Sequence, residues 1–174
     1  MKNEKNPLSA ILHAGDLSYA DFNQTRWDTW GRLVSPLAAT VPYMVCPGNH
    51  EIEVNDQVNL PFVAYQNRFQ MPFRESGATG GNLYYSFTLG LVHFIFLTPY
   101  APSHSHSDQY RWLLQNVQNV NRRETPWIIV IMHAPWYNSN IAHQDIQEPQ
   151  YEMKENMEPL FMEYKIDLVF AGRF

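Results

Sequence analysis

Apolar residues in this chain gather in short runs separated by polar segments that contain glycine and proline. Runs of this length, rich in β-branched and aromatic residues, are typical of buried β-strands. They predict strands at residues 10–14, 41–46, 83–88, 91–97, 127–132 and 166–170. Leu89 and Gly90 separate the third and fourth runs, and so short a connection predicts a β-hairpin.

Between the other strands, apolar residues recur at intervals of three and four, the spacing of one face of an α-helix. The predicted core faces are Trp27, Trp30, Leu33 and Leu37; Tyr110, Leu113, Leu114, Val117 and Val120; and Met153, Met157, Leu160, Phe161 and Tyr164. Ser107 stands where the second helix needs an N-cap, and a short helix is expected at residues 62–69. Strands that alternate with helices predict an α/β fold whose sheet contains parallel pairs.

Composition narrows the class of protein. The 174 residues suffice for one domain with a sizeable core, and we find no linker that would split them. A net charge of -5 and a pI near 5.7 argue against nucleic-acid binding and against anionic membranes. No run is long enough for a transmembrane helix, and residues 1–7 lack the apolar core of a signal peptide. A single cysteine, Cys46, excludes an internal disulfide framework and is expected in the core.

Candidate metal donors follow three of the predicted strands. Residues 15–19 read Gly-Asp-Leu-Ser-Tyr, residues 48–51 read Gly-Asn-His-Glu, and the strand at 127–132 is followed by His133. Ligands of open α/β sheets collect at the carboxyl ends of the strands. The sequence therefore predicts a metal site at one edge of the sheet.

The donor types suit two cations. The carboxylate of Asp16 can bridge two metals, and Tyr19 is close enough in sequence to reach one of them. A phenolate is a hard donor suited to a trivalent ion, whereas Asn49 and His133 suit zinc, manganese or ferrous iron. Two close cations lower the pKa of a bridging water and stabilise phosphate oxygens. The remaining histidine of the second motif, His50, is expected to contact phosphate or protonate a leaving alcohol.

Each motif alone also has an ordinary structural interpretation. Gly-Asp marks turns in many proteins, and Tyr19 may be read as a packing residue. Order and placement at strand ends favour the functional interpretation. Other polar residues receive structural interpretations. Asp21 and Asp28 are expected at turns or helix ends, His13 and His93 as packed or hydrogen-bonded residues inside strands, His104 and His106 in a solvated loop, and Asp167 at the start of a strand.

The motifs together resemble those of the plant-type purple acid phosphatases, in the metallophosphoesterase superfamily. The similarity extends to Ser18-Tyr19-Ala20-Asp21, Arg26-Trp27-Asp28, Asn82-Leu83-Tyr84-Tyr85-Ser86-Phe87, Ser107-Asp108-Gln109-Tyr110 and Pro135-Trp136-Tyr137-Asn138. The resemblance implies a binuclear centre of Fe(III) and a divalent metal (Zn, Mn or Fe). In that centre Asp16 bridges the metals, Tyr19 binds the ferric ion, and Asn49 and His133 bind the divalent ion. His50 and His143 then match positions near the substrate.

Two motifs of that family are missing. An Asp-x-Gly expected upstream of Asp16 has no counterpart in residues 1–8, and the final Gly-His-x-His reads Gly172-Arg173-Phe174 where the chain stops. We therefore expect a metallophosphoesterase-like layered β-sheet sandwich flanked by helices and truncated at both ends, with residues 1–174 as a partial catalytic domain. The missing donors, and the positive charge of Arg173, are expected to weaken metal affinity.

The resemblance implies an acid phosphatase that hydrolyses phosphate monoesters with a metal-bound hydroxide, impaired here by the missing ligands. Two alternatives stay open: a non-catalytic fragment that binds phosphate or a partner protein, and another metallophosphoesterase such as a phosphodiesterase. Tyr19 argues against the phosphodiesterase. The expected partner is a phosphate monoester, with neither nucleic acid nor membrane, and a homodimer is possible. Family members are usually secreted or vacuolar, but this sequence does not fix the compartment.

Overall fold

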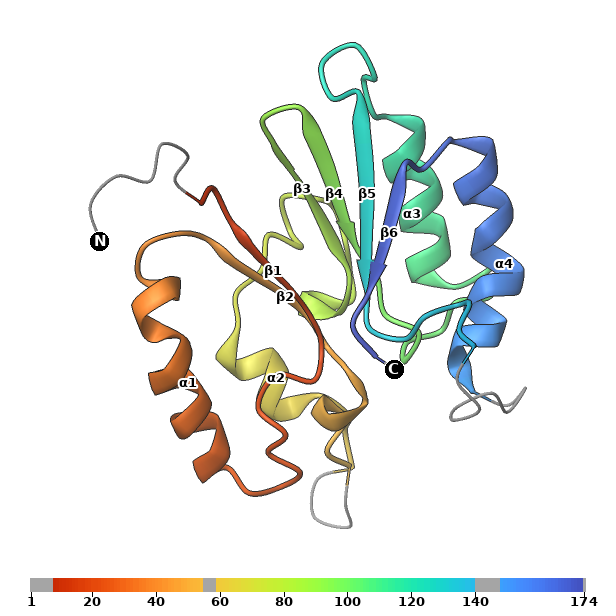
Figure 1. The fold of residues 1–174 in the computed structure, drawn as a ribbon. Helices are drawn as coiled ribbons and strands as arrows, with labels where there is room; N and C mark the ends of the chain where they lie inside the picture. Colours follow the sequence, from red (N-terminus) through yellow and green to blue (C-terminus); the bar gives the residue numbers. More distant parts are fainter. Residues whose placement is uncertain (1–7, 55–58, 140–147, 174) are drawn as a thin grey trace.

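The computed structural model describes residues 8–54, 59–139 and 148–173 (Figure 1). Its elements are β1 (Ile11–Ala14), α1 (Thr25–Ala38), β2 (Tyr43–Cys46), the 3-10 helix η1 (Asn49–Glu51), α2 (Val63–Arg68), the 3-10 helix η2 (Gly81–Leu83), β3 (Tyr85–Leu89), β4 (Val92–Phe96), α3 (Asp108–Gln118), β5 (Trp127–Met132), α4 (Pro149–Glu163) and β6 (Leu168–Ala171). Every strand and helix predicted from the apolar pattern is present, with ends shifted by a few residues.

The strands form two sheets. β1 and β2 pair in parallel, and the second sheet has the order β3-β4-β5-β6. Within it, β3 and β4 form the predicted antiparallel hairpin, while β4, β5 and β6 run parallel. The sheets converge at the carboxyl ends of β1, β2, β5 and β6 and spread apart at the other end (Figure 1). Loops that follow these strands are therefore brought to one place.

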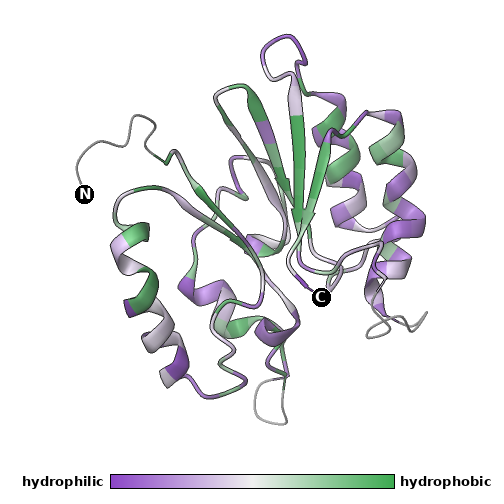
Figure 2. Cartoon of the chain, viewed as in Figure 1, coloured by the Kyte–Doolittle hydropathy of each residue, from purple (hydrophilic) through white to green (hydrophobic). Residues whose placement is uncertain are grey.

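Alternation along the central strands divides the core into two parts. Ile128, Val130 and Met132 of β5 face α3 and α4, whereas Ile131 faces the β1-β2 pair. Trp27 of α1 and Tyr65 of α2 close the second part from the other side. The order of layers is thus helices, small sheet, large sheet and helices, and apolar residues concentrate in the strands (Figure 2). This arrangement agrees with the predicted layered α/β fold.

The helices begin and pack largely as their sequences indicate. The Ser107 hydroxyl accepts the N–H of Tyr110 at 3.2 Å and caps α3, as predicted. In α1, however, Leu33 is 76% exposed and Leu37 is 50% exposed, so the predicted apolar face is only partly covered. No helix in the described ranges is long and apolar enough to cross a membrane.

Candidate metal centre

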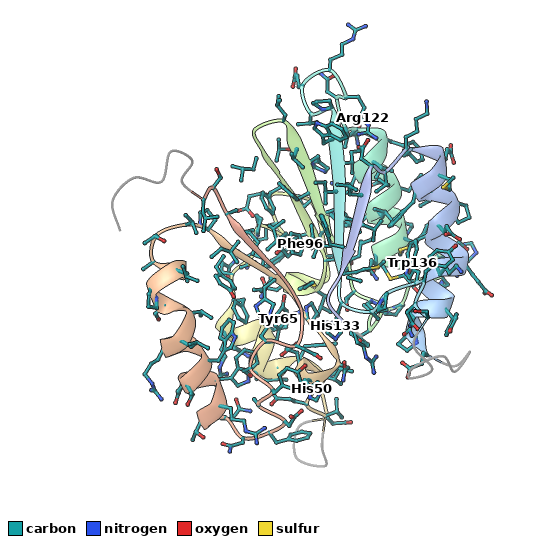
Figure 3. The ribbon with its side chains drawn as sticks, viewed as in Figure 1. His50, Tyr65, Phe96, Arg122, His133 and Trp136 are labelled. Carbon is teal, nitrogen blue, oxygen red and sulfur yellow. The ribbon has the colours of Figure 1, made fainter. Side chains whose placement is uncertain are left out.

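Three loops meet where the two sheets converge. Asp16 follows β1, Asn49 begins η1 just after β2, and His133 follows β5. His133 is 1% exposed, and its Nε2 lies 3.2 Å from Asp16 Oδ2 and 3.2 Å from Asn49 Oδ1. His50 lies at the same end of the molecule (Figure 3). The structure therefore brings together three of the four donors predicted from the motifs, with Tyr19 beside them.

The tautomer of His133 determines what this cluster can bind. The backbone carbonyl of Ala14 lies 2.7 Å from His133 Nδ1 and can only accept, so Nδ1 carries the proton. In a neutral imidazole Nε2 then presents a lone pair, and it faces oxygen atoms of Asp16 and Asn49 that are acceptors too. In the imidazolium form Nε2–H instead donates to Asp16 Oδ2, and a metal cation can take the place of that proton among the same three atoms. Metal-binding histidines commonly hold their second nitrogen in this way.

The donor set is unusual in composition. Within residues 8–54, 59–139 and 148–173, no group of three or more His, Cys, Asp or Glu side chains is placed to hold a metal ion. The cluster instead relies on the amide of Asn49 and the phenol of Tyr19 beside one carboxylate and one imidazole. Nitrogen and oxygen donors of this kind fit iron, zinc or manganese, so the residues present fit a metal while offering few strong ligands.

Close backbone approach shapes the site. A Cβ atom at Gly48 would lie 2.2 Å from Asp16 Oδ1, and one at Gly15 would lie 2.6 Å from His133 Nδ1. Only glycine leaves room for these contacts. The backbone φ angles of Asp16 (54°) and Tyr19 (48°) are positive, which is uncommon outside glycine and concentrates at functional sites.

Burial and neighbouring charges shift the pKa values of Asp16 and Tyr19. Burial alone would raise the pKa of Asp16, but the hydrogen bond and charge of His133 and the backbone N–H of His50 lower that pKa below its usual value. Burial and the nearby Asp16 carboxylate raise the pKa of Tyr19, so its phenol stays protonated in the absence of a cation. A bound metal would supply the positive charge that the phenolate needs.

His50 has a partner that the sequence interpretation missed. Its Nδ1 donates to Asp21 Oδ1 at 2.6 Å, and its ring centre lies 4.3 Å from that of Tyr19. Asp21 was assigned only a turn role, although its position five residues after Asp16 in a loop that curls back could have suggested the pairing. The contact fixes the orientation of the imidazole and leaves Nε2 for another partner. The other predicted substrate residue, His143, lies outside the described residues.

Glu51 was also given no role. Its carboxylate is 1% exposed and accepts the N–H groups of Asp16 at 2.9 Å, Leu17 at 2.8 Å and Gly48 at 2.8 Å. Burial raises the pKa of Glu51, and the N–H bonds from Gly48 and Leu17 act against that rise. The fourth residue of Gly-Asn-His-Glu thus ties the loop after β1 to the loop after β2.

Arg173 lies against the site through its backbone. Its N–H and that of Gly172 both donate to the carbonyl of His133, at 2.9 Å and 3.0 Å. The guanidinium is 3.5 Å from the carboxylate of Glu148. The positive charge that was expected to repel metal therefore has an acidic neighbour.

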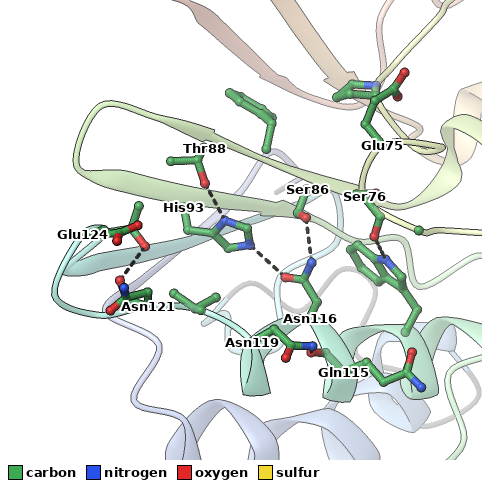
Figure 4. Close-up of a pocket in the computed structure, with 16 residues that line it drawn as sticks. Glu75, Ser76, Ser86, Thr88, His93, Gln115, Asn116, Asn119, Asn121 and Glu124 are labelled. Carbon is green, nitrogen blue, oxygen red and sulfur yellow. Dashed lines mark hydrogen bonds between the residues drawn. The ribbon is translucent and has the colours of Figure 1, made fainter.

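A cavity of about 740 Å³ lies away from this centre, between the β3-β4 hairpin and α3 (Figure 4). His93 on its wall accepts from or donates to Thr88 at 3.0 Å and donates to Asn116 Oδ1 at 2.8 Å. Asn116 in turn donates to Ser86 at 2.7 Å. These polar groups satisfy one another and join α3 to the hairpin, which agrees with a packing role for His93.

The fold and this cluster place the protein in a class: the chain belongs to the calcineurin-like phosphoesterase family, whose profile matches residues 2–172. This family is characterised by a binuclear metal centre and acts on phosphate esters. Within the class, the chain is similar to plant purple acid phosphatases. It is 52% identical to the probable purple acid phosphatase 20 of Arabidopsis thaliana over 159 residues, which cover 91% of this chain and 37% of the relative.

Two further proteins support this similarity to plant phosphatases. The phosphoenolpyruvate phosphatase of Allium cepa is 43% identical over 174 residues, covering 97% of this chain and 35% of the relative. A solved purple acid phosphatase from yellow lupin seeds superposes with a TM-score of 0.81 at 25% identity, covering 94% of this chain and 30% of that one. The predicted resemblance and fold are confirmed, and the chain spans little more than a third of the curated relatives.

Proposed function

We propose that residues 1–174 are a partial catalytic domain of an acid phosphatase that hydrolyses phosphate monoesters at a binuclear centre. The observation that supports this most strongly is the convergence of Asp16 Oδ2 and Asn49 Oδ1 on the Nε2 atom of His133, each at 3.2 Å. The similarity to plant purple acid phosphatases supports the same reaction class.

In this proposal Asp16 bridges the two metals, Tyr19 binds Fe(III), and Asn49 and His133 bind a divalent ion: zinc, manganese or iron. When bound, such a pair lowers the pKa of a water molecule and neutralises charge on phosphate oxygens. The protein's own part is to hold these donors in place. His133 does so with its proton fixed on Nδ1 by the carbonyl of Ala14, which reserves Nε2 for the metal.

His50 is the proposed contact to the substrate. Asp21 holds its Nδ1–H, so Nε2 can donate a proton to the leaving alkoxide or a hydrogen bond to phosphate. This arrangement uses an acid to orient an imidazole, as other hydrolytic sites do. His143 remains a second candidate for the same role.

One relative suggests a class of substrate. The onion protein is named a phosphoenolpyruvate phosphatase, and phosphoenolpyruvate is a phosphate monoester. We propose that this class, rather than diesters, is the substrate, because Tyr19 lies beside Asp16 and the resemblance associates a tyrosine ligand with the monoesterases.

The small number of strong metal ligands favours a second function. The described ranges hold no group of three His, Cys, Asp or Glu side chains suited to a metal. A chain of this composition that fails to retain two metals would be a non-catalytic phosphate-binding or partner-binding domain.

Elemental analysis of the 174-residue chain after reconstitution with iron and zinc separates the two functions. We expect close to two metals per chain, together with hydrolysis of p-nitrophenyl phosphate and phosphoenolpyruvate at acidic pH. Asp16→Asn removes the bridging charge and should reduce the stoichiometry to below one and abolish activity. Unchanged stoichiometry in that variant would refute the bridging role, and an empty wild-type chain would favour the non-catalytic domain.

A further inference from the structure

Two loops of the candidate centre are joined by one buried side chain. The Glu51 carboxylate, 1% exposed, accepts from Asp16 and Leu17 in the loop after β1 and from Gly48 in the loop after β2. Oε2 receives two of these N–H groups and Oε1 the third, at distances of 2.8–2.9 Å. All three donors are backbone groups, so the bonds fix main chain rather than side chains.

The backbone that Glu51 holds is strained. Asp16 has a φ of 54°, a conformation that is unfavourable for residues with a Cβ and persists only when its surroundings enforce it. The backbone N–H of Asp16 donates to Glu51 Oε2, and the Asp16 carboxylate accepts the backbone N–H of His50 at 3.2 Å. The Asp16 backbone is therefore fixed by the same short segment that carries Asn49.

We infer that Glu51 is a positioning residue: it sets the loop that carries Asp16 against the segment that carries Asn49, so that both face His133. This inference rests on the metal centre proposed above. When a residue that holds a metal ligand in place is replaced, metal affinity typically changes 10–100-fold. A carboxylate is required because all three neighbours are donors, and only two acceptor oxygens can receive them.

Glu51→Gln tests this with little change in volume. One terminal atom of glutamine is an NH₂ group, which must face at least one N–H and repel it. We expect amide exchange at Asp16, Leu17 and Gly48, followed by NMR, to become at least tenfold faster, and affinity for Zn²⁺, titrated calorimetrically with the metal alone, to fall at least tenfold. Glu51→Asp, which keeps the acceptors on a shorter arm, should be intermediate.

Two controls separate positioning from general destabilisation. Glu53→Gln removes the charge of a neighbouring acid and should leave Zn²⁺ affinity unchanged. Glu53 accepts the backbone N–H of Phe22 at 2.8 Å and the side-chain amide of Gln24 at 3.5 Å. Val117→Ala lowers stability in the α3 core, far from the centre, and should also keep the affinity while the protein remains folded.

The inference is overturned if folded Glu51→Gln binds Zn²⁺ as the wild type does, or if the three amides exchange at unchanged rates. Failure of the wild type to bind Zn²⁺ would instead refute the metal centre. In that case amide exchange still decides the role of Glu51: faster exchange confined to the three amides supports the link between the loops, and unchanged exchange refutes it.

Discussion

Hydrogen bonds hold both the imidazole and the backbone carbonyl of His133. Its imidazole donates to the carbonyl of Ala14, and its own carbonyl receives the N–H groups of Gly172 and Arg173. One histidine thus joins the ends of β1, β5 and β6. A side chain held in this way loses little entropy when it binds a metal, which favours affinity even where few ligands are present.

Asp21 is expected to matter through His50. In Asp21→Asn the imidazole loses a charged partner at 2.6 Å, while the fold should change little because the Asp21 side chain is 45% exposed. We expect kcat of the metal-loaded chain for p-nitrophenyl phosphate to fall at least tenfold with KM changed less than threefold. Asp28→Asn, on an exposed part of α1, is the matched control. An unaltered kcat would remove Asp21 from the mechanism.

Substitution of Arg173 tests whether an added donor strengthens metal binding. The resemblance implies a histidine at this position, and the backbone contacts of Arg173 to His133 do not depend on its side chain. Arg173→His should bind Zn²⁺ at least tenfold more tightly, because an imidazole donor replaces a cation. Arg173→Gln removes the charge without adding a strong donor. Equal affinities for these two variants would contradict a ligand role at this position.

At the scale of elements, Arg122 and Asp167 join the α3-β5 loop to the start of β6, at the end opposite the metal centre (Figure 3). Arg122 donates to Asp167 Oδ2 at 2.7 Å and to the carbonyls of Pro126, Tyr164 and Lys165. Asp167 also accepts the N–H of Ile128 at 2.7 Å. These contacts fix the register of β6 against β5.

This link predicts a pH dependence. The N–H of Ile128 and the hydrogen bond from Arg122 lower the pKa of Asp167, so its contribution is present above the usual carboxyl pKa and is lost as pH falls through the lower, folded value. Asp167→Asn should cost about 1–2 kcal/mol in urea unfolding at pH 7 and less at pH 3. Asp108→Asn, whose ion pair with Arg111 is exposed, should change stability by about 0.5 kcal/mol or less. A cost for Asp167→Asn that is independent of pH would contradict this assignment.

The sequence predicted the strands well because their apolar runs are short and bounded by clear turn signals. Leu33 and Leu37 show where periodicity fails: the spacing is helical, yet nothing in the described structure covers their side of α1. The donors Asp16, Asn49 and His133 were found because each follows a strand. Asp21 and Glu51 were not, because a carboxylate that bonds across a loop leaves no periodic signal, and only tertiary contacts reveal its partner.

At the scale of the whole molecule, β6 is the edge strand of the larger sheet, and its apolar side chains are open. Leu168 is 48% exposed, Val169 41% and Phe170 52%. An apolar edge of this kind favours pairing with another chain. We expect the 174-residue chain to associate with rising concentration in light scattering after size exclusion, and Phe170→Lys to shift it toward the monomer. Leu33→Lys, a change at an apolar position of α1 that is 76% exposed, is the control; a concentration-independent monomer would contradict the expectation.

The way the strands pair has a consequence for how the protein folds. Among the described strands, β3 and β4 pair across a two-residue turn, and an isolated hairpin forms in about 1–10 μs. The parallel pairs match Ile11 with Tyr43, Val92 with Trp127 and Ile129 with Leu168, and such distant contacts slow folding. We therefore expect the donors on Asp16, Asn49 and His133 to meet late in folding. A cation that binds them would then act mainly on the folded chain, by slowing its unfolding.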